Sequence, residues 1–121
     1  MVVDDEPTVR FVCGAVVRQI GYSPILAIDG EHGLTIFGQQ PHEIDLVLAD
    51  VSMPKLDGIE MVRKMFEIKP HSNVILMTGY TPELIIPDNV LKLCAALAKP
   101  FTVQQLTEAI RKCLEHEKHR E

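Results

Sequence analysis

The chain has 121 residues, a formal net charge of −5, and a composition that is 46% hydrophobic and 24% charged. This length fits one domain, and the composition excludes a disordered chain, a fibrous repeat and a low-complexity scaffold. The excess of 17 acidic over 12 basic residues argues against direct binding to nucleic acid or to an anionic membrane surface. No apolar stretch reaches the roughly 18 residues of a membrane span, and no signal peptide is visible, so no membrane insertion is expected.

Five short apolar runs, rich in β-forming residues, predict strands at residues 1–3, 24–28, 46–49, 74–78 and 95–98. The residues at 46–49 and 74–77 are continuously apolar rather than alternating, which is typical of strands that are buried on both faces.

Amphipathic helical patterns lie between these runs. The first has Pro7 near its first turn and Gly21 just past its end, which are favourable positions for these residues. A weaker pattern covers about 31–39, and a clear one covers about 58–68.

Two further helical patterns lie in the last third of the chain. Prolines 82 and 87 flank residues 83–86, so a late start or a distorted helix is expected there. The last helix begins at Thr102, which has capping-box spacing with Gln105.

Alternating strands and helices predict a parallel sheet with right-handed crossovers and helices on both faces. The expected fold is a three-layer, doubly wound (βα)5 α/β sandwich. Residues 1–121 are predicted to form one domain with a solvated tail at 116–121 and no output domain.

The three cysteines, Cys13, Cys94 and Cys113, are odd in number and lack Cys-x-x-Cys spacing. We therefore expect neither a disulfide framework nor a zinc ribbon, and a reducing, cytoplasmic setting. Cys13 and Cys113 fall on apolar helical faces, where cysteine behaves as a small hydrophobe. All three are predicted to be core residues.

Polar side chains follow the predicted strands at their carboxyl ends: Asp4 and Asp5, then Asp50, Thr78 and Lys99. In open parallel sheets this edge binds ligands. An acidic pair before a helix is by itself more often a helix-start feature. Three carboxylates that converge, however, require a cation, and oxygen ligands without His or Cys favour Mg²⁺.

A carboxylate can also act as a nucleophile that accepts a phosphoryl group. Metal and lysine charges then neutralise the negative charge that develops during the transfer. The set of three aspartates with Lys99 therefore predicts phosphoryl transfer to an aspartate.

The chain resembles receiver domains of two-component response regulators over nearly its whole length, and it is similar to the single-domain chemotaxis type. Each matching segment is weak alone, but their order and spacing together are specific. The segments are Val2-Val3-Asp4-Asp5-Glu6-Pro7, Asp45-Leu46-Val47-Leu48-Ala49-Asp50, Met53-Pro54, Asp57-Gly58, Met77-Thr78-Gly79 and Lys99-Pro100-Phe101.

The resemblance implies a flavodoxin-like strand order of 2-1-3-4-5 and a cis peptide bond before Pro100. It implies that Asp50 is the phosphoacceptor and that Asp5, Asp50 and the backbone carbonyl of Ser52 ligate Mg²⁺, with Asp4 acting through water. Thr78 and Lys99 would contact the phosphoryl group.

The implied partners are proteins. The phosphoryl donor would be a sensor histidine kinase or a phosphotransfer protein. The output would be a downstream protein that binds the face formed by the fourth helix, fifth strand and fifth helix, and a weak homodimer is left open.

Two positions depart from the family or modify its chemistry. Ala96 stands where receivers usually carry an aromatic residue that swings inward on phosphorylation. We hypothesise that Thr78 still moves and that the signal leaves through the fourth helix. Tyr80, two residues beyond Thr78, is predicted to slow hydrolysis of the phosphoaspartate.

Two alternative functions stay open at this point. One is a receiver fold that docks partners without phosphorylation, which Ala96 favours. The other is an aspartate-dependent phosphohydrolase of the haloacid dehalogenase type. That class places a second aspartate two residues after its nucleophile, whereas this chain has Ser52 there.

Overall fold

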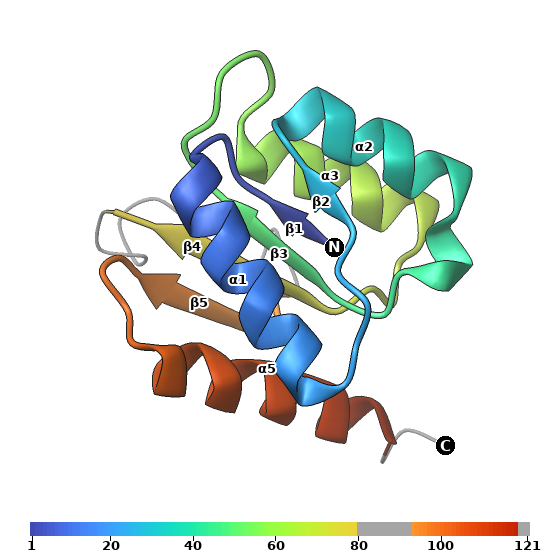
Figure 1. Ribbon diagram of the computed structural model, residues 1–121. Coiled ribbons are helices and arrows are strands. Elements are labelled where there is room, and N and C mark those ends of the chain that lie inside the picture. Colours follow the sequence, from blue (N-terminus) through green and yellow to red (C-terminus); the bar gives the residue numbers. More distant parts are fainter. Residues whose placement is uncertain (80–92, 119–121) are drawn as a thin grey trace.

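The computed structural model describes residues 1–79 and 93–118, and its centre is a parallel five-stranded sheet (Figure 1). All four neighbouring strand pairs are parallel, and the order is β2-β1-β3-β4-β5. The fold class and the strand order expected from the sequence are thereby confirmed. The strands are β1 (Val2–Val3), β2 (Leu26–Ala27), β3 (Val47–Asp50), β4 (Val74–Thr78) and β5 (Ala95–Ala98).

Helices cover both faces of the sheet. Figure 1 shows α1 and α5 on one face and α2 and α3 on the other. No helix of residues 1–79 and 93–118 is long and apolar enough to cross a membrane. The helices are α1 (Pro7–Ile20), α2 (Gly30–Gln39), α3 (Gly58–Ile68) and α5 (Val103–Lys118), with a short 3₁₀ turn at Pro41–Glu43.

The sheet separates the core into two clusters. Val47, Ala49 and Leu76 face the α2 and α3 side, whereas Leu48 and Ile75 face the α1 and α5 side. Strands β3 and β4 are buried along their whole length, as their continuous apolar runs predict.

Local capping explains where several helices begin. The Asp29 side chain accepts a hydrogen bond from the His32 amide at 2.8 Å, so α2 begins at Gly30, one residue earlier than expected. Asp57 caps α3 in the same way, and that helix has the predicted bounds. The proline-flanked pattern at 83–86 lies outside the described residues.

The register of the strands brings their carboxyl ends to one edge. Val3 of β1 lies opposite Ala49 of β3, so Asp4 and Asp50 follow side by side. Thr78, the last residue of β4, pairs with Ala98, the residue before Lys99.

The structure corrects the prediction about the cysteines. Cys94 and Cys113 form a disulfide with a Cα–Cα distance of 5.7 Å, and only Cys13 is a free, buried thiol. Cys94 is also exposed rather than in the core. Cysteine number and spacing missed the pair because β5 and α5 pack against each other, which brings residues 19 apart in sequence into contact.

Candidate functional site

Asp4 is held by bonds that form where β1 turns into α1. Its Oδ1 atom accepts a hydrogen bond from the Glu6 amide at 2.9 Å. Its backbone carbonyl accepts one from the guanidinium of Arg10 at 2.7 Å. The carboxylate is fully buried, so these contacts fix its direction and leave Oδ2 for another partner.

Asp50 ends β3 and is 5% exposed. The chain then runs through a loop that returns to the strand, where the Gly58 amide donates to the carbonyl oxygen of Val51 at 2.9 Å. A Cβ atom on Gly58 would overlap the carbonyl oxygen of Asp50. Glycine is therefore required at this position for the start of α3 to approach the backbone of Asp50 this closely.

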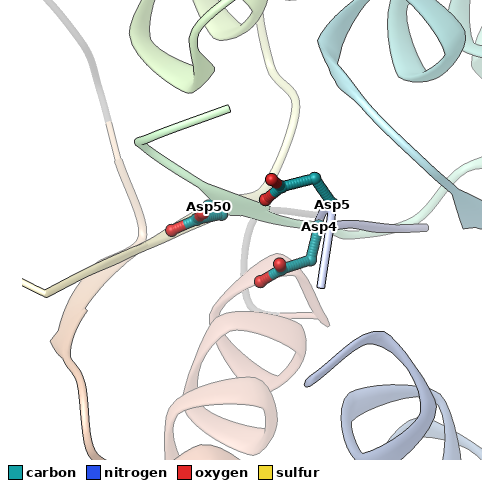
Figure 2. Close-up of side chains that lie close together, drawn as sticks. All are labelled: Asp4, Asp5 and Asp50. Atoms are coloured by element: carbon teal, nitrogen blue, oxygen red, sulfur yellow. The ribbon is translucent and has the colours of Figure 1, made fainter. Parts of the chain in front are cut away.

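Asp4, Asp5 and Asp50 form an acidic cluster, in which one carboxylate oxygen from each lies within 4.8 Å of the others. Figure 2 shows the three side chains at the same edge of the sheet. Asp5 is exposed, whereas Asp4 and Asp50 are buried, so the cluster opens to solvent on one side. An all-oxygen donor set with room for water ligands fits Mg²⁺.

Lys99 supplies the positive charge of the site. Its Nζ atom lies 3.2 Å from Asp4 Oδ2 and 3.2 Å from Asp50 Oδ1. Its backbone amide donates to the Thr78 carbonyl at 2.6 Å, and a cis peptide bond joins it to Pro100. Burial acts to lower the pKa of Lys99, but the two carboxylates outweigh burial and raise this pKa above its ordinary value.

The environment of Asp50 disfavours its ionised form. Burial is the largest cause, and the neighbouring charges of Asp4 and Asp5 act in the same direction. Lys99 opposes them, yet the pKa of Asp50 stays above its ordinary value of 3.8. A cation in the cluster would therefore favour the carboxylate form of Asp50.

The structure thus brings together four of the predicted site residues, Asp4, Asp5, Asp50 and Lys99. Thr78 is 1% exposed and lies at the same edge, at the end of β4. Ser52 is exposed in the loop two residues beyond Asp50, and its carbonyl stays a predicted ligand. Tyr80 lies outside the described residues.

Two positions that shape the site were missed by the sequence analysis. Arg10 fixes the Asp4 backbone, but in the sequence it is only one basic residue of an amphipathic helix. Gly58 belongs to a segment that carries the family resemblance, but the sequence does not indicate that a Cβ atom there would overlap the Asp50 carbonyl oxygen. Both contacts depend on the packing of helices against strand ends, which no local pattern encodes.

Comparison with known proteins finds related sequences and similar folds. A family model described as the response regulator receiver domain matches residues 1–111. The chain is 32% identical over 115 residues to sporulation initiation phosphotransferase F of Bacillus subtilis (strain 168). The aligned region covers 94% of this chain and 91% of that protein.

Two solved structures extend the comparison. A response regulator receiver domain protein from Clostridium thermocellum matches with a TM-score of 0.89 and 31% identity, over 99% of this chain and 96% of the other. The response regulator TrrA of Thermotoga maritima, solved in complex with Mg²⁺ and beryllium fluoride, has a TM-score of 0.80 and 29% identity, over 93% and 96% of the two chains.

Proposed function

The chain belongs to the family of response regulator receiver domains of two-component systems, and we propose from this premise that Asp50 is its phosphoacceptor. The observation that carries the proposal is the position of Asp50: a buried carboxylate at a strand end, 3.2 Å from the ammonium group of Lys99, beside two further carboxylates. This geometry supports transfer of a phosphoryl group to Asp50, because the ammonium group of Lys99 can neutralise the negative charge that the phosphoryl group adds.

The proposed step moves a phosphoryl group from a phosphohistidine of a sensor kinase or phosphotransfer protein. A carboxylate oxygen of Asp50 attacks phosphorus, the P–N bond breaks, and the histidine ring leaves with the electron pair of that bond and takes up a proton. Asp5, Asp50 and the Ser52 carbonyl, with Asp4 through water, would hold Mg²⁺. The bound ion would neutralise charge on the phosphoryl oxygens.

Lys99 and Thr78 have the remaining roles. Lys99 already contacts Asp50, and its ammonium group would transfer one contact to a phosphoryl oxygen while keeping Asp4 as its second partner. Thr78 lies at the end of the neighbouring strand, where its hydroxyl would donate a hydrogen bond to the phosphoryl group.

An apolar surface beside Lys99 supports a protein donor. A groove of about 410 Å³ lies between α1 and the β5–α5 connection, and Val12, Lys99 and Phe101 are among its lining residues. Phe11 is 75% exposed on the same helix. We propose that the protein that carries the phosphohistidine packs here, because this surface adjoins the ammonium group that faces Asp50.

The proposed output is a change in binding to a downstream protein at the face of the fourth helix, β5 and α5. Ala96 is exposed on β5, so the usual aromatic residue has no counterpart at that position. The domain is proposed to accept a phosphoryl group on Asp50 and to catalyse no other reaction than, at most, the slow loss of that group.

Beryllofluoride, which mimics a phosphoryl group on a carboxylate, tests this function. Bound fluorine signals in ¹⁹F NMR are expected only when Mg²⁺ is present and only with Asp50 intact. Amide hydrogen exchange should change between Thr78 and Leu93 on binding. Binding without any exchange change there would favour the docking-module alternative, and no binding at all would refute the phosphoacceptor role.

A further inference from the structure

The disulfide between Cys94 and Cys113 joins two elements of the proposed output face. Cys94 immediately precedes β5, and Cys113 lies in α5, which runs along that side of the sheet in Figure 1. The Cys94 amide donates to the Val74 carbonyl at 2.8 Å, so this end of the link is fixed to β4. Cys113 is 1% exposed within the core cluster that also contains Ile110.

The two halves of the disulfide differ in access to solvent. Cys94 is exposed, whereas Cys113 is buried. An exposed disulfide is open to attack by an external thiolate, and such disulfides are the labile and regulatory ones, in contrast to shielded structural pairs.

Cys13 is the one other cysteine of the chain, and it does not form an alternative disulfide with Cys94 or Cys113. It is buried in α1, and its Sγ atom contacts the Sδ atom of Met77 at 4.0 Å. Burial also raises its pKa to about 11, which keeps it as an unreactive thiol.

We propose that Cys94 and Cys113 are a reversible redox site that fastens α5 to the start of β5. The reductant is a dithiol or a small thiol such as glutathione. Its thiolate attacks Sγ of Cys94, the S–S bond breaks, and Cys113 leaves as a thiolate that takes up a proton. A second thiol resolves the mixed disulfide, so that the protein gains two electrons and two protons while the reductant becomes a disulfide.

The link also encloses the phosphoryl-binding lysine. The covalent loop from Cys94 to Cys113 contains β5, Lys99 and the first turns of α5. Closing it restricts the segment that presents Lys99 to Asp4 and Asp50, so less ordering is required when a phosphoryl group binds. The oxidised form is therefore expected to bind beryllofluoride more tightly, and this consequence rests on the proposed function.

The redox step is tested on the full chain in glutathione buffers of graded GSH and GSSG content. After an acid quench and alkylation under denaturing conditions, mass spectrometry should count one alkylated cysteine at the oxidising end and three at the reducing end. Three alkylated cysteines in every buffer, or one alkylated cysteine in every buffer even with dithiothreitol, would overturn the proposal.

Thermal unfolding supplies a second readout with an internal control. Wild type should lose about 10 °C in Tm on reduction, as expected for opening a loop of this length. Cys94→Ser cannot form the disulfide, so its Tm should not respond to reductant. If reduction changed the Tm of both proteins equally, or changed neither, the result would contradict a disulfide between Cys94 and Cys113.

The effect on the site is measured by ¹⁹F NMR titration of beryllofluoride with Mg²⁺. Oxidised wild type should bind at least about threefold more tightly than reduced wild type, with no such difference in Cys94→Ser. Equal or reversed affinities would refute the coupling to Lys99. Absence of binding in both forms would refute the proposed phosphoacceptor function instead, while the mass and Tm results would still decide the redox site.

Discussion

The Nζ atom of Lys99 lies 3.2 Å from the Oδ1 atom of Asp50, across the carboxyl ends of β5 and β3. The Asp50 side chain is 7% exposed and that of Lys99 is 21% exposed, so water screens this pair weakly. The same ammonium group also contacts Asp4, and one positive charge therefore serves two buried carboxylates. A metal ion or a phosphoryl group that enters the site must change this balance of charge.

Replacing Lys99 with methionine should destabilise the metal-free protein. The variant keeps most of the apolar stem but leaves the two buried carboxylates without a cation, at a cost of about 2 kcal/mol in the free energy of unfolding. Lys112→Met, at an exposed position of α5, is the matched control and should change stability little. Chemical denaturation in EDTA makes the comparison, and equal stability of the two variants would contradict the role of Lys99.

Replacing Asp50 with asparagine should have the opposite effect in metal-free buffer. A carboxyl group whose pKa is raised by folding binds its proton more tightly in the folded chain, so its ionisation near pH 7 costs folding free energy. The neutral amide of Asp50→Asn removes that cost, and the variant should be more stable by about 1 kcal/mol.

Adding Mg²⁺ should make wild type more stable than Asp50→Asn. The ion is expected to raise the Tm of wild type and to raise that of Asp50→Asn much less, because the variant lacks one proposed ligand. Thermal melts in EDTA and in Mg²⁺ measure both effects. A wild type that is already the more stable protein in EDTA would contradict the raised pKa of Asp50, which burial and the neighbouring carboxylates cause.

The affinity for Mg²⁺ should decrease as the pH falls. Since the pKa of Asp50 lies above 3.8, protonation of the cluster begins at a higher pH than for an ordinary aspartate. Calorimetric titrations between pH 8 and pH 4 at constant ionic strength should show affinity that is constant at the alkaline end and declines on acidification. Affinity that stays constant down to pH 4 would contradict the assignment of Asp50 as a ligand.

Substitution of Gly58 tests the backbone contact that positions Asp50. In Gly58→Ala the new methyl group would overlap the Asp50 carbonyl oxygen, so the loop must shift and stability should fall by about 2 kcal/mol or more. Gly38→Ala is the control, because a Cβ there meets nothing within 4 Å. In helix α2 that substitution should stabilise by up to about 1 kcal/mol. Equal changes in the denaturation midpoints of the two variants would contradict a close approach of Gly58 to the Asp50 backbone.

Much of the fold could be predicted because its signals are local. Residues 46–49 and 74–77 are continuous apolar runs, and the amphipathic pattern at 58–68 gives the bounds of α3. The site followed from topology, since parallel strands place Asp4, Asp50 and Lys99 at one edge without any knowledge of packing.

The remaining features depend on tertiary contacts. The bond from Arg10 to the Asp4 carbonyl requires the position of α1 over the end of β1. The Cys94–Cys113 disulfide requires α5 to lie against β5, and counting cysteines predicted the opposite. Sequence patterns describe which face of an element is buried, but they do not specify which residues of two packed elements meet.

Phosphorylation by acetyl phosphate tests the central claim most directly, because it needs no protein partner. Wild type and Asp50→Asn would each be incubated with acetyl phosphate and Mg²⁺, and intact mass would be measured. Wild type should gain the mass of one phosphoryl group, lose it on treatment with hydroxylamine, and gain nothing in EDTA, while Asp50→Asn should stay unmodified. A phosphoryl group on Asp50→Asn, or none on wild type, would contradict the assignment of Asp50 as the phosphoacceptor.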